Sequence, residues 1–323
     1  MSGLDAAERA CAVADRSNLG RLIGTGPDLL GLLHRLSTGD VKTLHPGEGR
    51  ETVLTNAKGR IIERVSVHHL GDAGVLLVTG SMASPRVLAH LRKFTFAENT
   101  GLEDVTAPTF AVALFGPRWN EAAAAIGIPE LTPYGASACT IAGVRVHAAR
   151  TNGFDAEGVL VIGPSDGFEP VHARLVAAAE SFGGGAIDSD ALEAWRILKG
   201  LPASGHELTE DHNPLEAGLR DAISFTKGCY VGQEVVARLN TYGKVSRALV
   251  RLEFEAGAPV PAIGASLVQG GVAVGTITSA VLPPGRLAPV ALAYVKTREI
   301  PEAVTAITVD DGGTFRNATI LRP

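Results

Sequence analysis

The chain has 323 residues, of which 46% are hydrophobic and 20% charged, and it contains 38 glycines and 18 prolines. This balance excludes a largely disordered chain, and the length predicts more than one structural domain. The formal net charge is −5, which disfavours a protein that binds nucleic acid through overall positive charge.

The three cysteines, Cys11, Cys139 and Cys229, are widely separated. They fit neither a disulfide framework nor a zinc site, and three thiols cannot supply the four ligands of a usual iron–sulfur cluster. We therefore expect no metal and no permanent cluster. Residues 1–15 lack the features of a secretory signal, and no apolar run is long enough to span a bilayer. These features predict a cytoplasmic protein that does not bind membranes.

The first elements alternate between strands and helices. A strand over 20–26 ends in glycine, and Pro27 begins a helix whose leucines recur at helical spacing until Gly39. Three strands of an antiparallel meander are expected next, over 51–56, 60–70 and 75–79. A serine–proline pair then begins a second helix, expected over 84–93.

The same order of elements then recurs. A strand at 110–115 is followed by Gly116-Pro117, as the first strand is followed by Gly26-Pro27. The rest of the second copy is expected as a helix, a hairpin and a helix, over 118–126, 140–150 with 157–163, and 169–182. Antiparallel strands covered by helices, present twice, predict an α+β fold with two similar halves. No GxGxxG or Walker loop is present, which disfavours a nucleotide-binding α/β sheet.

The pattern changes near residue 246. A helix is expected at 190–198, followed by a polar, irregular stretch over 202–217 whose histidines and acids are not expected to hold a metal. Beyond it, short β-rich segments alternate with glycine and proline, which is typical of a small closed barrel. We therefore predict two domains: pseudo-repeated antiparallel sheets with covering helices over 1–245, and a small C-terminal β-barrel over 246–323.

The segment 224–234, named here the signature segment, concentrates polar and reactive side chains. It contains Cys229 close to Lys227, whose positive charge favours a thiolate. A short helix is predicted over 230–238, and a cysteine at its N-terminus is favoured as a thiolate by the helix dipole. The polar neighbours of Cys229 favour a reactive cysteine. The alternative is a buried structural cysteine, and we expect this structural role for Cys11 and Cys139.

Within this segment, Lys227-Gly-Cys-Tyr-Val-Gly-Gln-Glu234 resembles the K-G-C-Y-x-G-Q-E signature of YgfZ-type folate-binding proteins, a branch of the glycine-cleavage T-protein (aminomethyltransferase) superfamily. The likeness extends over nearly the whole chain, through Asn56-Ala-Lys-Gly-Arg-Ile61 and Asn213-Pro-Leu-Glu-Ala-Gly-Leu219. It implies a tetrahydrofolate-type ligand in a central channel between domains. It also implies a role in making or maintaining iron–sulfur proteins, with effects on tRNA-modifying cluster enzymes.

The resemblance also implies a set of site residues. Cys229 matches the residue associated with activity in relatives, and Lys227 is expected to tune it. The expected ligand contacts are Asn56, Glu63, Trp195, Arg196, Tyr230, Gln233, Glu234 and Arg238. Instead of contacting a ligand, Trp195 can be an aromatic side chain that faces the core. Glu63 can likewise be a solvated strand residue without a ligand role. Arg238, Lys244 and Arg247 either meet a polyglutamate tail or an RNA phosphate, or form a solvated basic stretch.

Two positions depart from the family pattern. A T-protein hairpin ends in an Asp-Asp pair with one essential member, whereas this chain has Glu63 and Arg64. A carboxylate there positions the aminomethyl group or accepts its proton, so an arginine weakens that chemistry. Relatives also read R-x-E-A-G where this chain places Leu198, and the glutamate can bond the pterin. A leucine accepts no hydrogen bond, and each unmatched polar group costs about 1–3 kcal/mol of folate binding.

These observations favour a tetrahydrofolate-binding accessory protein for iron–sulfur cluster assembly or repair, with assembly or client proteins as partners. The first alternative is a folate-dependent aminomethyl- or methyltransferase, so whether the protein is an enzyme stays open from sequence. The second alternative is a non-catalytic scaffold for a cluster-carrying partner. Direct binding of tRNA is disfavoured by the net charge of −5, which still permits a local basic patch.

Overall fold

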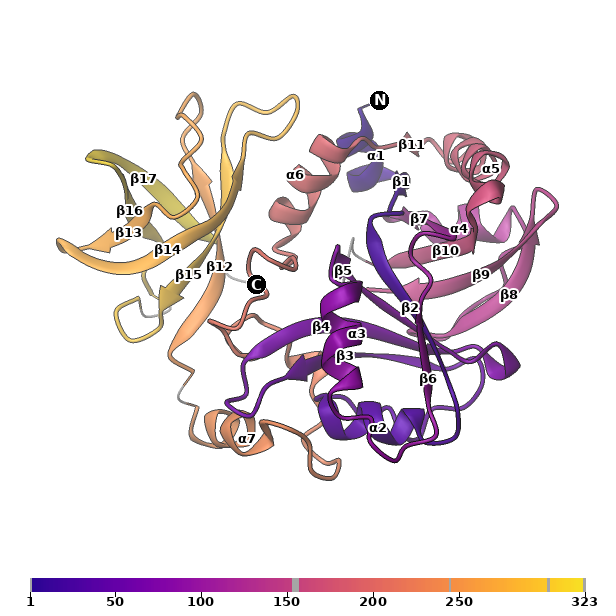
Figure 1. Ribbon diagram of the computed structural model, residues 1–323. Coiled ribbons are helices and arrows are strands. Elements are labelled where there is room, and N and C mark those ends of the chain that lie inside the picture. The colour runs from indigo at the N-terminus through magenta and orange to yellow at the C-terminus, as the bar shows by residue number, and fades with distance from the viewer. Residues whose placement is uncertain (1, 153–156, 244, 301–302, 322–323) are drawn as a thin grey trace.

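The computed structural model describes residues 2–152, 157–243, 245–300 and 303–321. Figure 1 shows three units: two sheet-and-helix halves, and a β-barrel at the left. Helix α6 (Ser189–Lys199) lies between the halves and the barrel. Among the described residues, we find no helix with the length and apolar character needed to cross a membrane.

The first half is a five-stranded antiparallel sheet in the spatial order β3-β4-β5-β2-β6. Its strands are β2 (Leu19–Thr25), β3 (Gly49–Thr55), β4 (Ile61–His69), β5 (Val75–Ser81) and β6 (Gly101–Asp104). Its helices are α2 (Leu29–Leu36), the short 3-10 turn η1 (Gly71–Ala73) and α3 (Ser84–Arg92). The buried leucines of α2 lie on one face and pack against the sheet, as their helical spacing predicts.

The second half is a six-stranded sheet in the order β11-β1-β7-β10-β9-β8, in which only β1 and β11 pair in parallel. Its strands are β1 (Ala12–Asp15), β7 (Thr109–Phe115), β8 (Ala136–Ile141), β9 (Val144–Thr151), β10 (Gly158–Pro164) and β11 (Gly185–Ala186). Its helices are α1 (Gly3–Arg9), α4 (Trp119–Ala124), the turn η2 (Ser165–Gly167) and α5 (Phe168–Ser181).

The repeat predicted from sequence is confirmed. The order β2-α2-β3-β4-β5-α3 in the first half corresponds to β7-α4-β8-β9-β10-α5 in the second. Gly26 and Gly116 follow the first strand of each copy with φ of +96° and +106°, a region that favours glycine. A Cβ atom at Gly26 would lie 2.1 Å from the carbonyl oxygen of Asn99, so this turn requires glycine for space as well.

The two halves exchange their leading strands. β1 precedes β2 in the chain, yet it pairs with β7, with Ala12 opposite Phe115. β6 precedes β7, yet it pairs with β2, with Asp104 opposite Leu22. Because each sheet is completed by a strand from the other side of the repeat, the halves cannot separate without breaking both sheets.

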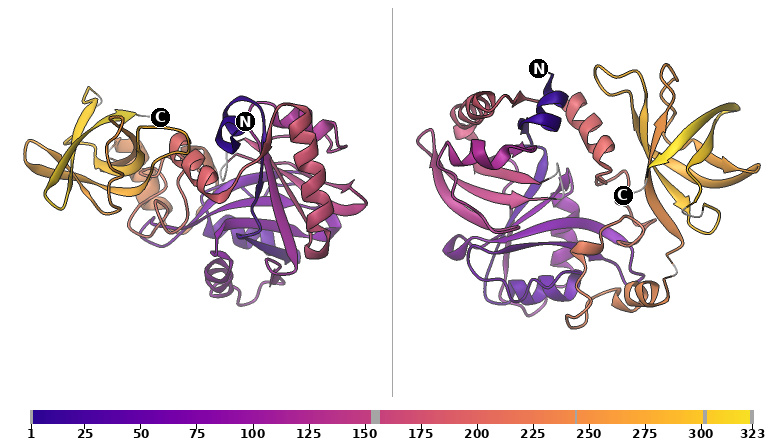
Figure 2. Two further views of the ribbon diagram at one scale, coloured as in Figure 1. Left: turned by 90° about the horizontal axis from the view of Figure 1, so that it is seen from above. Right: turned by 180° about the vertical axis from the view of Figure 1, so that it is seen from behind.

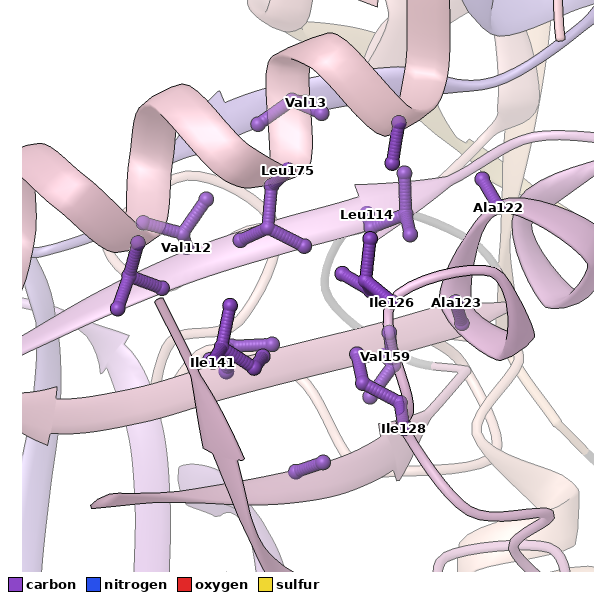
Figure 3. Close-up of a cluster of buried hydrophobic side chains, with 14 of the residues drawn as sticks. Val13, Val112, Leu114, Ala122, Ala123, Ile126, Ile128, Ile141, Val159 and Leu175 are labelled. Atoms are coloured by element: carbon purple, nitrogen blue, oxygen red, sulfur yellow. The ribbon is translucent and has the colours of Figure 1, made fainter. Parts of the chain in front are cut away.

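The core of the second half lies between its sheet and α5 (Figure 3). Val13, Val112 and Leu114 from the strands meet Leu175 of α5, and all four side chains are fully buried. Burying such a side chain contributes about 1.5–3 kcal/mol. Branched aliphatic residues and alanines thus build most of this core, as the low aromatic content of 5% predicts.

The last part of the chain is a closed six-stranded barrel in the order β12-β15-β14-β13-β16-β17. Its strands are β12 (Arg247–Phe254), β13 (Ser266–Gln269), β14 (Val272–Val281), β15 (Val290–Lys296), β16 (Ala306–Asp311) and β17 (Thr314–Leu321). The turn η3 (Arg220–Ala222) and α7 (Gln233–Tyr242) lead into it. Leu252, Leu267 and Val309 are fully buried in its core. The predicted fold class, α+β with a small C-terminal barrel, is confirmed.

Two boundaries predicted from sequence are wrong. Residues 140–150 are predicted as one strand, but Ala142 and Gly143 turn tightly between β8 and β9, with φ of +49° and +80°. The helix predicted from residue 230 begins instead at Gln233, because Gly232 takes a left-handed φ of +85° just before it. The second correction moves the start of the helix away from Cys229.

Candidate functional site

A cavity of about 450 Å³, named here the central cavity, lies where the two halves meet α6. Its walls come from the connection after β1, from β4, from the end of β5, from α6 and from the segment 202–208. Figure 2 shows α6 between the halves and the barrel in the view from behind. The charged or titratable lining residues are Asp15, Arg16, Glu63, Arg64, Asp188, Glu193, Arg196 and His206.

Glu63 supplies a fully buried carboxylate to the wall of the central cavity. Its Oε2 atom accepts hydrogen bonds from Arg86 Nη2 at 2.5 Å and from Ser204 Oγ at 2.6 Å. Its Oε1 atom accepts the backbone N–H of Arg64 at 3.2 Å. Glu63 is therefore not a solvated strand residue, because β4 is buried along nearly its whole length. These hydrogen bonds hold the Glu63 carboxylate in one orientation, and the guanidinium of Arg86 balances its charge.

Gly80, at the end of β5, provides the space that this arrangement needs. A Cβ atom there would lie 2.3 Å from Cβ of Ser204 and 3.1 Å from Oε1 of Glu63. Any side chain at this position would push Ser204 away. The hydrogen bond between Ser204 and Glu63 therefore depends on a glycine in β5.

Arg196 of α6 is the second predicted ligand contact that lines the central cavity. Its guanidinium donates to Glu207 Oε2 at 2.9 Å, to Ser279 Oγ at 2.8 Å and to the carbonyl oxygen of Leu201 at 3.0 Å. Glu193 accepts a further bond from Nε at 2.8 Å. Burial alone would lower the pKa of Arg196, but hydrogen bonds and charges from Glu193 and Glu207 raise it. Because Ser279 belongs to β14, this network joins α6 to the barrel.

Arg64 lines both the central cavity and a second cavity of about 500 Å³, named here the Glu51 cavity. The Arg64 side chain is buried, and its Nε atom lies 3.9 Å from Oε2 of Glu51 on β3. The position at which the T-protein pattern has an acid therefore carries a guanidinium beside a different carboxylate. This exchange changes the charge at the meeting point of the two cavities.

The signature segment packs against the first half of the molecule. The Nζ atom of Lys227 donates to the carbonyl oxygens of His34, Ser37 and Gly39 at 2.7, 2.7 and 2.6 Å, at the C-terminal end of α2. An ammonium group has three protons, so these bonds use all of them. Burial lowers the pKa of Lys227 to about 8. Lys227 thus stabilises the negative end of the α2 dipole. Its ammonium protons are donated to these carbonyl oxygens and not to Cys229.

Cys229 is exposed, whereas Cys11 is buried. Cys229 lies four residues before Gln233, where α7 begins, and is therefore outside the first helical turn. The predicted effect of a helix dipole on this thiol is not supported, because such effects act within the terminal turn. Val231 accepts a hydrogen bond from Thr55 Oγ1 at 2.6 Å, which holds the segment beside Cys229 against β3.

Three predicted ligand contacts serve local packing. Asn56 lies in the β3–β4 turn, and its Oδ1 atom accepts the backbone N–H groups of residues 58 and 60. Trp195 is buried in the core, with its ring centroid 5.7 Å from that of Phe115. Tyr230 is buried with its ring centroid 5.1 Å from Nζ of Lys227. These positions lie outside the lining of the central cavity.

The remaining predicted contacts lie on α7. Gln233 is the first residue of this helix, and Glu234 and Arg238 are exposed on it. Lys244 lies outside the described residues. Of all the ligand contacts predicted from sequence, the central cavity brings together Glu63 and Arg196.

Sequence reasoning missed Arg86, Ser204 and Glu207, which hold these two side chains in place. Two of the three belong to the polar stretch over 202–217, whose composition is a weak signal of a functional loop. No local pattern pairs them with residues of β4 or α6. Within the described ranges, no cluster of three or more His, Cys, Asp or Glu side chains is placed to hold a metal ion.

The fold and the cavity define a two-half α+β protein with a C-terminal barrel and a charged interdomain site. A family model described as the GCVT N-terminal domain matches residues 3–227, and one described as the glycine cleavage T-protein C-terminal barrel domain matches residues 247–323. The chain therefore belongs to the glycine cleavage T-protein family.

Individual relatives agree with this family. An aminomethyltransferase of Thermus thermophilus is 32% identical over 305 residues, covering 90% of this chain and 81% of that protein. An aminomethyltransferase of Mycobacterium leprae is 26% identical over 319 residues, covering 98% of this chain and 86% of that protein. A chloroplastic protein of Arabidopsis thaliana is 31% identical over 85% of this chain, and the match spans 63% of that relative's length.

The fold is shared with a solved structure. The crystal structure of the glycine cleavage system aminomethyltransferase T from Bartonella henselae superposes with a TM-score of 0.83, covering 99% of this chain and 87% of that one. The two sequences are 21% identical, so this likeness establishes the fold.

Proposed function

We propose that the protein binds a tetrahydrofolate-type one-carbon carrier in the interdomain region that contains the central cavity. The observation that carries this proposal is the buried, fixed carboxylate of Glu63 on the wall of a cavity of about 450 Å³. A folate combines a polar heterocycle with an anionic tail, and the guanidinium groups of Arg64 and Arg196 line the same cavity. Membership of the glycine cleavage T-protein family supports the same ligand class.

The proposed biological role is that of a cytoplasmic accessory protein for iron–sulfur cluster assembly or repair, with Cys229 as its reactive residue. An exposed thiol beside a segment anchored by Lys227 and Thr55 supports this role, because a partner protein can reach it. The signature segment lies outside the lining of the central cavity, so carrier and thiol occupy separate places. The proposed clients are cluster enzymes, with tRNA-modifying enzymes among them.

The second candidate is a folate-dependent aminomethyl- or methyltransferase, which the names of the relatives favour. Arg64 opposes it, because a guanidinium does not accept a proton from an amine. Glu63 is the remaining acid of the pair, and it is already engaged by Arg86 and Ser204. The third candidate is a scaffold, which predicts that Cys229→Ala keeps full function.

Calorimetric titration with tetrahydrofolate under reducing, anaerobic conditions tests the binding proposal. We expect micromolar affinity, about −8 kcal/mol. Glu63→Gln removes the fixed charge and should weaken binding roughly tenfold or more. Glu130→Gln is the matched control, because this carboxylate is exposed in the other half. Absence of binding at millimolar ligand contradicts the proposal.

Genetic rescue tests the role of the thiol. In a strain that lacks the protein, Cys229→Ala should fold normally by circular dichroism and fail to restore iron–sulfur enzyme activity. Normal rescue contradicts a reactive thiol and favours the scaffold. Turnover of tetrahydrofolate with a methylated amine favours the transferase.

A further inference from the structure

A closed triangle of hydrogen bonds engages the Glu63 carboxylate at the wall of the central cavity. Arg86 Nη2 donates to Glu63 Oε2 at 2.5 Å and to Ser204 Oγ at 3.1 Å, and Ser204 Oγ donates to the same carboxylate oxygen at 2.6 Å. The Glu63 side chain is fully buried, whereas that of Arg86 is 48% exposed. Arg86 also lies outside the described lining of the central cavity. It therefore acts on this cavity through Glu63.

The turn between β5 and α3 places Arg86 beside Glu63. Met82 in this turn has a φ of +59°, a left-handed conformation that costs energy for a residue other than glycine. Helix α3 begins directly after the turn, at Ser84, and Arg86 lies in its first turn. Backbone strain of this kind persists where the surrounding structure fixes it, and it clusters at functional sites. The position of Arg86 is therefore set by the backbone as well as by its own hydrogen bonds.

The triangle leaves Glu63 little capacity for a ligand. A carboxylate has about four acceptor positions. Glu63 uses two of them at Oε2, for Arg86 and Ser204, and one at Oε1, for the backbone N–H of Arg64. The Oε1 atom also lies beside the space that Gly80 leaves open, since a Cβ atom at Gly80 would be 3.1 Å from it. A ligand in the cavity can donate one further hydrogen bond there, but it meets a carboxylate whose charge is already balanced.

This charge balance decides which chemical groups suit the wall at Glu63. An ammonium or amidinium group gains most from a carboxylate that has no other cation beside it. At Glu63 such a group would meet Arg86 across the same carboxylate, while Arg64 and Arg196 also line the cavity. Like charges in a poorly solvated cavity repel each other, whereas a neutral group meets no such repulsion. The other acids of the lining are exposed or already paired with an arginine: Asp15, Asp188 and Glu193.

We propose that Arg86 determines the charge specificity of the central cavity: because it balances the charge of Glu63, the cavity accepts a carrier whose one-carbon unit is neutral and refuses one whose unit is cationic. The inference rests on the proposed function, since it names the class of one-carbon unit on the proposed carrier. The charge of the wall can also be tested without any carrier. Arg86 is a positioning residue in this account, because it acts on the ligand through Glu63.

The first test uses two probes that differ in the charge of the one-carbon unit. 5-Formyltetrahydrofolate carries a neutral formyl group, and 5-formiminotetrahydrofolate carries a formimino group of similar shape that is protonated at neutral pH. By calorimetry on the full chain, the native protein should bind the formyl probe roughly tenfold more tightly than the formimino probe, or better. Arg86→Ala should remove or reverse this preference, and Arg86→Lys, which keeps the charge, should retain it. Arg92→Ala, an exposed arginine of the same helix, is the control and should show the native preference.

The second test needs no carrier. Acetamidinium and acetamide have nearly the same size and differ in charge, and a molecule that binds the folded state raises the melting temperature. At equal concentration and ionic strength, acetamidinium should raise the melting temperature of Arg86→Ala above the value in acetamide. The native protein and the double variant Arg86→Ala/Glu63→Gln should show no such rise, because the first has its own cation at Glu63 and the second has no charge there.

The outcomes separate this inference from the proposed function. Equal affinity of the native protein for the two folate probes overturns the inference and leaves the carrier proposal standing, as does a native preference that persists in Arg86→Ala. If neither folate probe binds, the carrier proposal is overturned, and the melting temperatures decide the inference. A rise confined to Arg86→Ala then supports it, and equal values in all three proteins overturn it. Should Arg86→Ala fail to fold, a rise in the native protein with acetamidinium overturns the inference without any variant.

Discussion

Arg196 Nη1 lies 2.9 Å from Glu207 Oε2, and both side chains are buried. The pair joins α6 to the segment 202–208 at the edge of the central cavity. Ser279 of β14 donates to the other oxygen of Glu207 at 2.7 Å, so the same pair reaches the barrel. The position of the barrel relative to the two halves therefore depends on charges that are hidden from solvent.

Breaking this ion pair should destabilise the protein strongly. Arg196→Met leaves the carboxylate of Glu207 buried without its cation, and we expect a loss of about 3–5 kcal/mol in the free energy of unfolding. The double variant Arg196→Met/Glu207→Leu removes both charges and should regain most of that loss. Urea denaturation measures both values. A loss below about 1 kcal/mol in the single variant would show that solvent reaches the pair.

His68 should make the fold sensitive to mild acid. Its ring bonds Ser66 Oγ and the carbonyl oxygen of Tyr134, each at 2.8 Å, and burial lowers its pKa from 6.5 to about 4. Between pH 6.5 and pH 4 the His68 ring is protonated in the unfolded state and neutral in the folded state. Stability should therefore fall as the pH drops from 6.5 to 4, by roughly 3 kcal/mol in total.

The measurement is the free energy of unfolding at several pH values for the native protein and for His68→Asn. The variant lacks the titrating ring, so its stability should vary less across this range. His45→Asn, at an exposed position, serves as the control and should follow the native curve. Identical pH curves for all three proteins would mean that His68 keeps an ordinary pKa in the folded state.

Cys229 and Cys11 should differ in reactivity with N-ethylmaleimide. Cys229 is exposed, whereas Cys11 is buried and burial raises its pKa. In the native protein we expect Cys229 to react roughly tenfold faster or more than Cys11, and Cys11 to reach a comparable rate only after denaturation. Peptide mass spectrometry distinguishes the sites. Labelling of Cys11 at the rate of Cys229 would contradict the packing of the second half.

The repeat could be predicted because local signals determine it. Gly26-Pro27 and Gly116-Pro117 mark equivalent turns, and the apolar spacing after the first pair fixes the buried face of α2. The exchange of β1 and β6 could not be predicted in the same way. Strand partners depend on pairing between residues far apart in the chain, which no local pattern records.

The candidate site could be predicted only in part, for the same reason. Motif positions indicated Glu63 and Arg196, and both line the central cavity. The composition around Cys229 suggested that Lys227 tunes the thiol, but its three bonds go to carbonyl groups at the end of α2. The placement of Glu51 Oε2 3.9 Å from Arg64 Nε leaves no trace in sequence, because the two residues lie on different strands.

Gly80→Ala tests how closely β5 and the segment 202–208 must approach. The added Cβ would lie 2.3 Å from Cβ of Ser204, so the segment must move and lose its hydrogen bond to Glu63. We expect a loss of about 1–3 kcal/mol in the free energy of unfolding, with weaker binding of 5-formyltetrahydrofolate. Gly185→Ala is the control, since a Cβ there meets no atom within 4 Å.

A second substitution separates space from hydrogen bonding at the same place. Gly80→Ala/Ser204→Gly removes the clash with Ser204 but also removes the hydroxyl that donates to Glu63. Stability should recover in this double variant, while the affinity for 5-formyltetrahydrofolate should stay reduced because one contact that fixes the carboxylate is missing. If affinity recovers together with stability, the orientation of Glu63 does not depend on Ser204, and Arg86 together with the backbone N–H of Arg64 holds it.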